Sequence, residues 1–280
     1  MYWTYQQMYW SCYGPPKLPE FKMFLFLLAR DSPNSIFCFR CGRLHSPRRS
    51  DKVQNWLPWS WSNCESFDGS LMQMYYGPHF HFEGSQLAMQ QHRCGLIPTK
   101  QLKHITKFSS LKKSFLPRSV SPDLKTLRSL EARIVSNRLL VKTIRKKYFR
   151  PGVSQSFVDT TAVRLYICPH LVEHQGSIRN ITNCCLIQKG PYTKESESDG
   201  HLISQCTHCL TELQVEVSGA KGKFVDTRSL IVTVWQDFGS LDHPADPDWY
   251  SHLDTINSPA VVAFNIGSIR KAFENASSLK

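Results

Sequence analysis

The chain has 280 residues, of which 41% are hydrophobic and 12% aromatic, and it carries a formal net charge of +12. This length and composition support a buried core and exclude a disordered chain. The charge comes from one segment, because residues 100–150 hold nine Lys and six Arg against Asp123 and Glu131, a balance of +13 that leaves −1 for the rest.

The apolar run from Met23 to Ala29 is seven residues long. A membrane span needs about 20 apolar residues, and a secretory signal needs small residues at a cleavage site, whereas Arg30 and Asp31 follow this run. We therefore expect no membrane partner and an intracellular protein of the cytoplasm or the nucleus. In a reducing compartment, closely spaced cysteines indicate metal or redox chemistry more often than disulfides.

In chain order, the first element expected is an irregular, aromatic-rich tail. The stretch from Phe21 to Arg30 predicts a short buried helix, which ends at Asp31-Ser32-Pro33 because proline disfavours a helical residue before it.

A Cys-x-x-Cys motif follows that helix, with a histidine shortly after it. Two thiolates at this spacing lie on one tight turn and can bind a single tetrahedral Zn²⁺. A thioredoxin-like redox pair is the competing interpretation, but that motif opens a helix directly after a strand, whereas Gly42 favours a turn. The metal ligands predicted here are Cys38, Cys41, His45 and Cys64, with His92 or Cys94 as substitutes for the last two.

Between this motif and the basic segment, histidine and phenylalanine alternate over residues 79–82 as in a strand, and residues 84–91 look helical. Ser and Pro punctuate the first part of the basic segment, which predicts a linker. From Glu131 the pattern is that of two antiparallel strands, 132–136 and 138–145, joined by a turn at Ser136-Asn137.

The C-terminal half predicts mainly β-structure. Residues 162–167 form an apolar strand, and residues 210–217 alternate, with Leu213 on one face and Glu212 on the other. Residues 230–235 are almost continuously apolar, which predicts a central strand. Residues 267–276 are the last helix candidate.

A second Cys/His motif lies in this half. Cys168-x-His170 closes one predicted strand, and Cys206-x-x-Cys209 precedes another. In zinc-ribbon-like folds, two such turns at neighbouring strand ends each supply two ligands to one structural zinc. His174 is an alternative to His170, and the competing interpretation is that these cysteines are buried thiols that pack as small apolar residues.

No enzyme motif is found in the sequence. It has no HExxH, no deaminase signature, no G-x-S-x-G, no P-loop and no GxGxxG after a strand. A catalytic zinc keeps an open position beside a base, and no such arrangement is indicated. We therefore expect a protein that is not an enzyme.

The basic segment supports an alternative function. Fifteen cations in residues 100–150 can contact several phosphates of a nucleic acid, with strongly salt-dependent binding. Few aromatic residues interleave with these cations, and no base-reading motif is present. Nucleic-acid binding through residues 100–150 is thus the second hypothesis.

Several motifs together resemble a group of F-box-like proteins of filamentous fungi. The resemblance covers about residues 22–255, and each motif is weak alone but occurs in the order typical of the group. The matching stretches are Leu27-Leu28-Ala29-Arg30-Asp31-Ser32-Pro33, Phe37-Cys38 to Leu44-His45, His79-Phe80-His81-Phe82, Glu131-Ala132-Arg133-Ile134-Val135, Ile167-Cys168-Pro169-His170, Cys206-Thr207-His208-Cys209 and Val234-Trp235-Gln236-Asp237-Phe238-Gly239.

This resemblance implies a non-catalytic, zinc-stabilised protein-interaction module, similar to the substrate-recruiting part of an F-box protein. It implies other proteins as partners, among them a ubiquitin-ligase adaptor or its substrates. The sequence departs from the group because Leu18-Pro19-Glu20 alone matches the start of an F-box, and Cys38 follows too soon for a complete copy.

The fold class expected is α+β, with short helices and a zinc-knuckle-like part first and a mainly antiparallel β part second. That second part should contain the zinc-ribbon-like pair of turns. The expected divisions are 1–20, aromatic-rich tail; 21–98, Cys/His region; 99–130, basic linker; 131–265, mainly β domain; and 266–280, C-terminal helix and tail.

Overall fold

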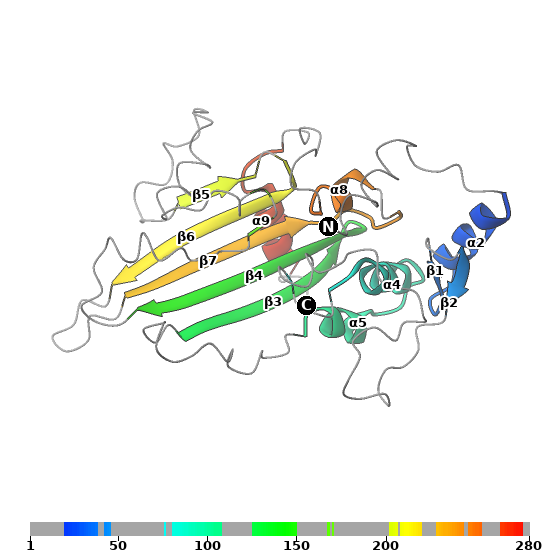
Figure 1. The fold of residues 1–280 in the computed structure, drawn as a ribbon, viewed down its shortest axis with the longest axis horizontal. Coiled ribbons are helices and arrows are strands. Elements are labelled where there is room, and N and C mark those ends of the chain that lie inside the picture. The colour runs from blue at the N-terminus through cyan, green and yellow to red at the C-terminus, as the bar shows by residue number, and fades with distance from the viewer. Residues whose placement is uncertain are drawn as a thin grey trace, which may run out of the picture.

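The computed structural model shows an α+β protein built on one antiparallel sheet (Figure 1). The sheet has five strands in the order β3-β4-β7-β6-β5, and a separate two-stranded sheet pairs β1 with β2. The expected fold class, α+β with antiparallel strands, is confirmed. The structure describes residues 20–38, 42–45, 76, 80–107, 125–149, 167–168, 170, 202–206, 208–219, 228–243, 246–253 and 264–276.

The strands and helices alternate in blocks along the chain. The strands are β1 Ile36–Cys38, β2 Arg43–His45, β3 Lys125–Val135, β4 Arg138–Phe149, β5 Leu202–Gln205, β6 Thr211–Gly219 and β7 Arg228–Asp237. The helices are α2 Glu20–Arg30, α4 Phe82–Arg93, α5 Thr99–Ile105, α8 Pro247–Tyr250 and α9 Ser268–Asn275. No helix in the described part of the chain is long and apolar enough to cross a membrane.

The β3–β4 hairpin confirms the predicted turn at Ser136-Asn137. Both residues have positive φ, 49° and 59°, which is the geometry of a two-residue hairpin turn whose twist matches that of the strands. Strand β3 begins at Lys125, earlier than the Glu131 expected, because its first residues pair with the far end of β4. Part of the predicted linker is therefore strand, and another part is helix α5.

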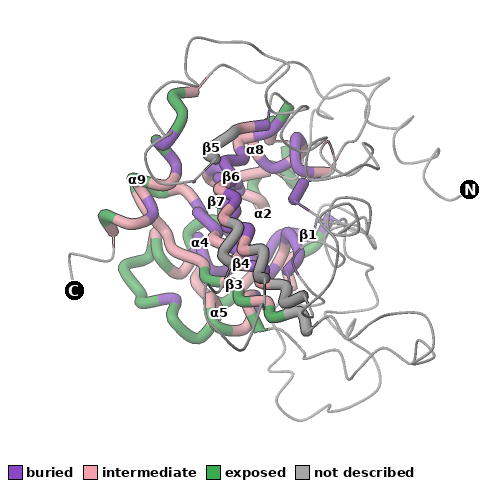
Figure 2. The backbone as a smooth tube through the Cα atoms, turned by 90° about the vertical axis from the view of Figure 1, so that its left-hand side faces the viewer, coloured by how far each residue is buried: buried purple, intermediate pink, exposed green. Residues whose placement is uncertain are grey.

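Strand β7 is central, as its apolar run predicts. It pairs with β4 on one side and β6 on the other, and residues 232–238 are all buried. Figure 2 shows buried residues gathered along these middle strands. A strand covered on both faces reads as continuously apolar because neither face meets water.

Two hydrophobic clusters lie on opposite faces of the sheet. On one face, aromatic residues of α4 and α8 pack on β4 and β7, with the Trp249 ring 5.4 Å from Phe238 and 5.3 Å from Phe82. On the other face, Ile269 and Phe273 of α9 pack on Trp235. Helices thus cover both faces of one end of the sheet.

Helix α9 covers the face of β6 that carries Glu212, opposite to Leu213. This carboxylate is 1% exposed, and its oxygens accept hydrogen bonds from Ile269 N at 3.1 Å and Arg270 N at 2.9 Å. These amides begin the helix, where a carboxylate is favoured by the helix dipole. The alternation is correct, but both faces are covered here.

Two local expectations are wrong. Helix α2 forms where predicted but is not buried, since Ala29 is its only buried residue. The predicted strand at residues 79–82 is absent from its described positions: Phe82 begins α4, and His81 is the N-cap, whose side chain accepts from Gly84 N at 3.1 Å. The alternation of histidine and phenylalanine therefore marks the N-cap of a helix here and not a strand. The predicted strand 162–167 lies outside the described residues except for Ile167, which forms a bend.

Candidate metal centre

Two of the four ligands predicted from the second Cys/His motif lie in the connection between β5 and β6. Cys206 directly follows β5, and Cys209 lies two residues before β6. Cys206 N donates to Thr211 O at 2.9 Å, Thr211 N donates to Cys209 O at 2.7 Å, and His208 N donates to the Cys206 sulfur at 3.4 Å. These bonds close a tight turn that places both sulfurs on one side.

Cys168 and His170 reach the same point from a distant part of the chain. One ligand atom of each of Cys168, His170, Cys206 and Cys209 lies within 4.8 Å of the others. We call these four residues the Cys₃His cluster. Its three cysteines are 0–3% exposed and His170 is half-buried. The structure therefore brings together all four residues predicted for this site, in a set that can hold a metal ion.

The side chain of Gln236 links the segment that carries Cys168 to the segment that carries Cys209, and Tyr76 contacts Gln236. The Gln236 amide nitrogen donates to Ile167 O and to Thr211 Oγ1, both at 3.3 Å, and to the Tyr76 hydroxyl. The Cys209 sulfur lies 3.1 Å from Thr211 Oγ1. Sequence reasoning missed both residues. A buried amide at the end of the apolar strand β7 was the only available signal for Gln236, and nothing local marks Tyr76.

The three thiols are electrostatically unequal. Hydrogen bonds from Cys168 and Cys209 hold the pKa of Cys206 well below its ordinary value, whereas burial raises the pKa values of Cys168 and Cys209. A single thiolate is thus stabilised by two neighbouring thiols. Three thiolates this close repel each other strongly unless a cation lies between them, and a bound metal ion deprotonates coordinating thiols.

His170 is the fourth member of the cluster. Its ring stacks on His208 with centroids 5.1 Å apart, and it lies close enough to Cys206 to help lower the pKa of that thiol. Both of its nitrogens are buried, and neither has hydrogen-bond geometry with a described residue. Leaving a buried imidazole nitrogen unsatisfied is costly, which a metal ion bound to one nitrogen would relieve.

The first Cys/His motif is described only in part. Cys38 ends β1 and is buried, and His45 ends β2. Because Cys38 pairs with Arg43 and Ile36 with His45, Cys38 and His45 share one face of this hairpin. Cys41 and Cys64 lie outside the described residues, so this ligand set stays a prediction. Among the residues that the structure describes, the Cys₃His cluster is the one group of three or more candidate ligands that converge.

The turn predicted within the first motif is present. Gly42 N donates to Cys38 O at 2.8 Å, and Gly42 has a φ of +65°, a conformation that glycine adopts readily. A Cβ on Gly42 would lie 2.7 Å from the Lys22 side chain of α2. Glycine therefore permits both the turn and the close approach of the helix.

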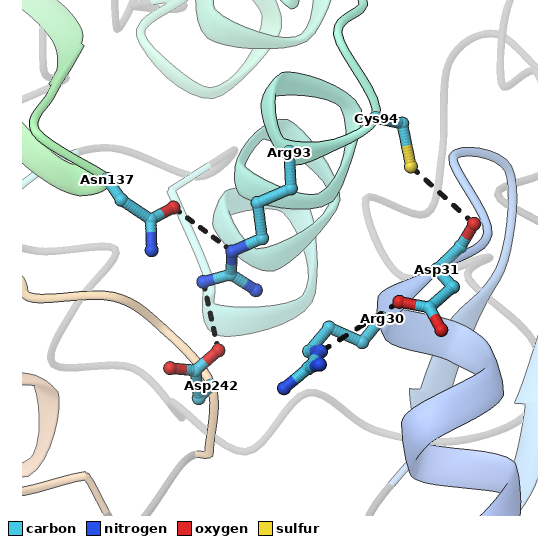
Figure 3. Close-up of a pocket in the computed structure, with 6 residues that line it drawn as sticks. All are labelled: Arg30, Asp31, Arg93, Cys94, Asn137 and Asp242. Carbon is cyan, nitrogen blue, oxygen red and sulfur yellow. Dashed lines mark hydrogen bonds and ion pairs between the residues drawn. The ribbon is translucent and has the colours of Figure 1, made fainter.

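One of the two proposed substitutes for this motif, Cys94, has polar surroundings. Cys94 lines a cavity of about 410 Å³ with Arg30, Asp31, Arg93, Asn137 and Asp242. Figure 3 shows the Cys94 sulfur directed at Asp31 O, 3.6 Å away, and Arg93 bridging Asn137 and Asp242. None of the Cys₃His residues lines this cavity.

The cluster thus consists of three buried thiols and one half-buried imidazole, which two segments of the chain supply. The side chain of Gln236, from strand β7, fixes the two segments. It lacks a carboxylate among its four converging groups. Comparison of the chain with protein-family models, with curated proteins and with solved structures finds no match.

Proposed function

We propose that Cys168, His170, Cys206 and Cys209 bind one structural Zn²⁺, and that the protein is a non-catalytic protein-interaction module stabilised by that zinc. The observation that carries the proposal is the convergence of the four ligand atoms within 4.8 Å of one another. Zinc bound at about 2.3 Å from sulfur and about 2.0 Å from nitrogen fits within such a group.

The donor set selects the metal. Three soft thiolates with one imidazole suit Zn²⁺, whereas Mg²⁺ and Ca²⁺ prefer oxygen ligands. Cys₃His is one of the common ligand sets of structural zinc sites, which are tetrahedral. The site therefore resembles the zinc-ribbon arrangement in which two turns each give two ligands.

Four protein ligands fill a tetrahedral site. No position then remains for the water or substrate that a catalytic zinc must bind. The metal's role is to join residues 167–170 to the β5–β6 connection, which Gln236 already links through hydrogen bonds. Metal binding then contributes directly to folding free energy.

The partners proposed are other proteins, as the resemblance to fungal F-box-like proteins implies. Nucleic-acid binding through residues 100–150 has less support, because cations of the β3–β4 hairpin pair with acids of the same chain. Arg138 contacts Asp237 and Asp248, both at 2.7 Å, and Lys142 contacts Glu274 at 2.6 Å. Such cations are less available to phosphates.

Metal analysis of the purified full-length chain tests the proposal. We expect zinc in the wild type, and one equivalent less in Cys206→Ser. Cys12→Ser is the matched control, since Cys12 belongs to neither Cys/His motif, and it should keep the wild-type zinc content. Wild-type protein without zinc, or equal zinc contents in the two variants, would overturn the proposal.

The module's binding class is tested separately by titrating the same protein with mixed-sequence DNA and RNA at several salt concentrations. We expect weak binding with little salt dependence. Tight binding that falls steeply with salt would instead favour the nucleic-acid hypothesis without affecting the metal result.

A further inference from the structure

Helix α2 presents an apolar surface to solvent, which the zinc site does not explain. Five large side chains on it, each between 42% and 68% exposed, are Phe21, Met23, Phe24, Leu27 and Leu28. They recur at spacings of three and four residues, so they form one stripe along the helix. Scattered exposed apolar residues are normal, but a contiguous stripe marks an interaction site.

The opposite face of α2 is anchored to the rest of the protein. Ala29 is buried, and the Phe26 ring packs edge-on against Phe37 of β1 at 6.1 Å. Lys22 lies against the turn at Gly42. The stripe therefore faces away from the β1–β2 hairpin, and Figure 1 shows α2 beside that hairpin at one end of the molecule, away from the five-stranded sheet.

We propose that this stripe binds the same stripe of a second copy of the chain, with the two α2 helices antiparallel. Opposite charges flank the stripe, with Glu20 in the first turn and Arg30 in the last. They lie at equal distances in sequence from Leu25, as do Met23 and Leu27. A twofold axis near Leu25 therefore places Glu20 of each copy beside Arg30 of the other.

The charges at the two ends of α2 favour a second copy of the same helix, and they favour the antiparallel arrangement. A parallel pair would put Glu20 against Glu20 and Arg30 against Arg30, which is repulsive, and an isologous interface requires self-complementarity. Arg30 lines the edge of the cavity beside Cys94, but its ion pair with Asp31 is long, at 3.9 Å, and both side chains are more than half exposed. Its side chain can therefore turn toward a second copy. Exposed pairs of that kind contribute little to stability.

The expected dimer is weak. An eleven-residue helix is about 16 Å long, and five side chains per copy are fewer than the roughly 20–30 residues per partner in a stable interface. We expect dissociation constants on the order of 10–100 μM rather than an obligate dimer. The surface differs from the zinc site in position and chemistry, so each can fail independently.

Sedimentation of the full chain over a range of concentrations tests the dimer. The average mass should rise from 32.2 kDa toward twice that value. Phe24→Ser should abolish the rise, whereas Ile97→Ser, a control at an 87% exposed apolar residue outside α2, should leave it unchanged. A chain that stays monomeric at the highest concentration would overturn the proposal.

Charge exchange tests the antiparallel direction. Glu20→Arg alone and Arg30→Glu alone should each weaken the dimer about tenfold, because each turns two attractive pairs into repulsive ones. The double variant E20R/R30E should return to within about threefold of wild type. If the effect were only on helix stability, the double variant would be the weakest, and that result would overturn the antiparallel pairing.

Discussion

The two Cys/His regions of this chain have similar spacing but different surroundings. In the Cys₃His cluster, three buried sulfurs and one imidazole meet, and Gln236 ties together the segments that supply them. In the first motif, Cys38 and His45 share one face of a short hairpin between α2 and α4. A Cys-x-x-Cys motif therefore predicts a turn, whereas a complete site needs ligands delivered by another part of the chain.

The regions also differ in how much structure depends on them. The cluster lies at the end of the central sheet, next to β6 and β7, so its loss would expose the sheet's buried end. The β1–β2 hairpin of the first motif packs against α2 and α4. We therefore expect variants of the two regions to have unequal effects on the free energy of unfolding.

The largest effect should come from removing a ligand of the cluster. Cys209→Ser should lower the free energy of unfolding by on the order of 4 kcal/mol or more, because the loss of a metal is among the most destabilising changes. Cys38→Ser should cost less, about 1–2 kcal/mol for a buried polar replacement. Urea unfolding with zinc analysis measures both, and equal losses would contradict the comparison.

Acid should weaken the region near the cluster through His252. Burial lowers the pKa of this imidazole from 6.5 to about 4, and its ring packs on Phe238. Between those pH values the unfolded chain binds the proton and the folded chain does not. The contribution of His252 to the free energy of unfolding is therefore fully present above pH 6.5. It falls as the pH drops toward 4, by on the order of 3 kcal/mol.

His252→Gln isolates this effect, since glutamine can keep a hydrogen bond to Asp237 O but does not titrate. Unfolding is measured for both proteins from pH 7 to pH 4. Both proteins lose metal in acid to the same extent, so the difference between their free energies of unfolding does not contain that effect. Parallel curves would show that His252 does not contribute to the pH dependence.

An intermediate effect is expected at Gln236. Gln236→Met keeps the length of the side chain but leaves Ile167 O and Thr211 Oγ1 without this donor, which should cost about 1–3 kcal/mol. Zinc should still bind, with about 10–100-fold lower affinity, as for other residues that support metal ligands. Competition with a chelator measures the affinity of the site for zinc. Gln214→Met is the control, because Gln214 is a half-buried amide on the face of β6 opposite to Thr211.

The smallest effect should come from Gly42→Ala in the first motif. Alanine is strained at a φ of +65°, and its Cβ would displace the flexible end of Lys22, so a loss of about 1 kcal/mol is expected. The zinc bound by the cluster should be unchanged. A loss of that zinc would show that the two regions are coupled.

The four ligands of the candidate site could be predicted from local sequence. The residues that support them, Tyr76 and Gln236, could not. Cys206 and Cys209 share a turn whose geometry depends on nearby residues, and Cys168 and His170 were predicted as their partners from the same kind of spacing. Tyr76 and Gln236 come from distant positions and have ordinary sequence surroundings. Their role arises only when β7 and residue 76 pack beside the turn.

Local sequence was enough to predict the hairpin at Ser136-Asn137, the central position of β7 and the alternation of β6, because turn geometry and burial periodicity act within a few residues. The burial of Glu212 under α9, the exposure of α2 and the convergence of the four ligands follow from tertiary packing. These outcomes depend on which surfaces compete for the core. Aromatic residues of α4, α8 and the loop after β7 fill it, which leaves the apolar stripe of α2 outside.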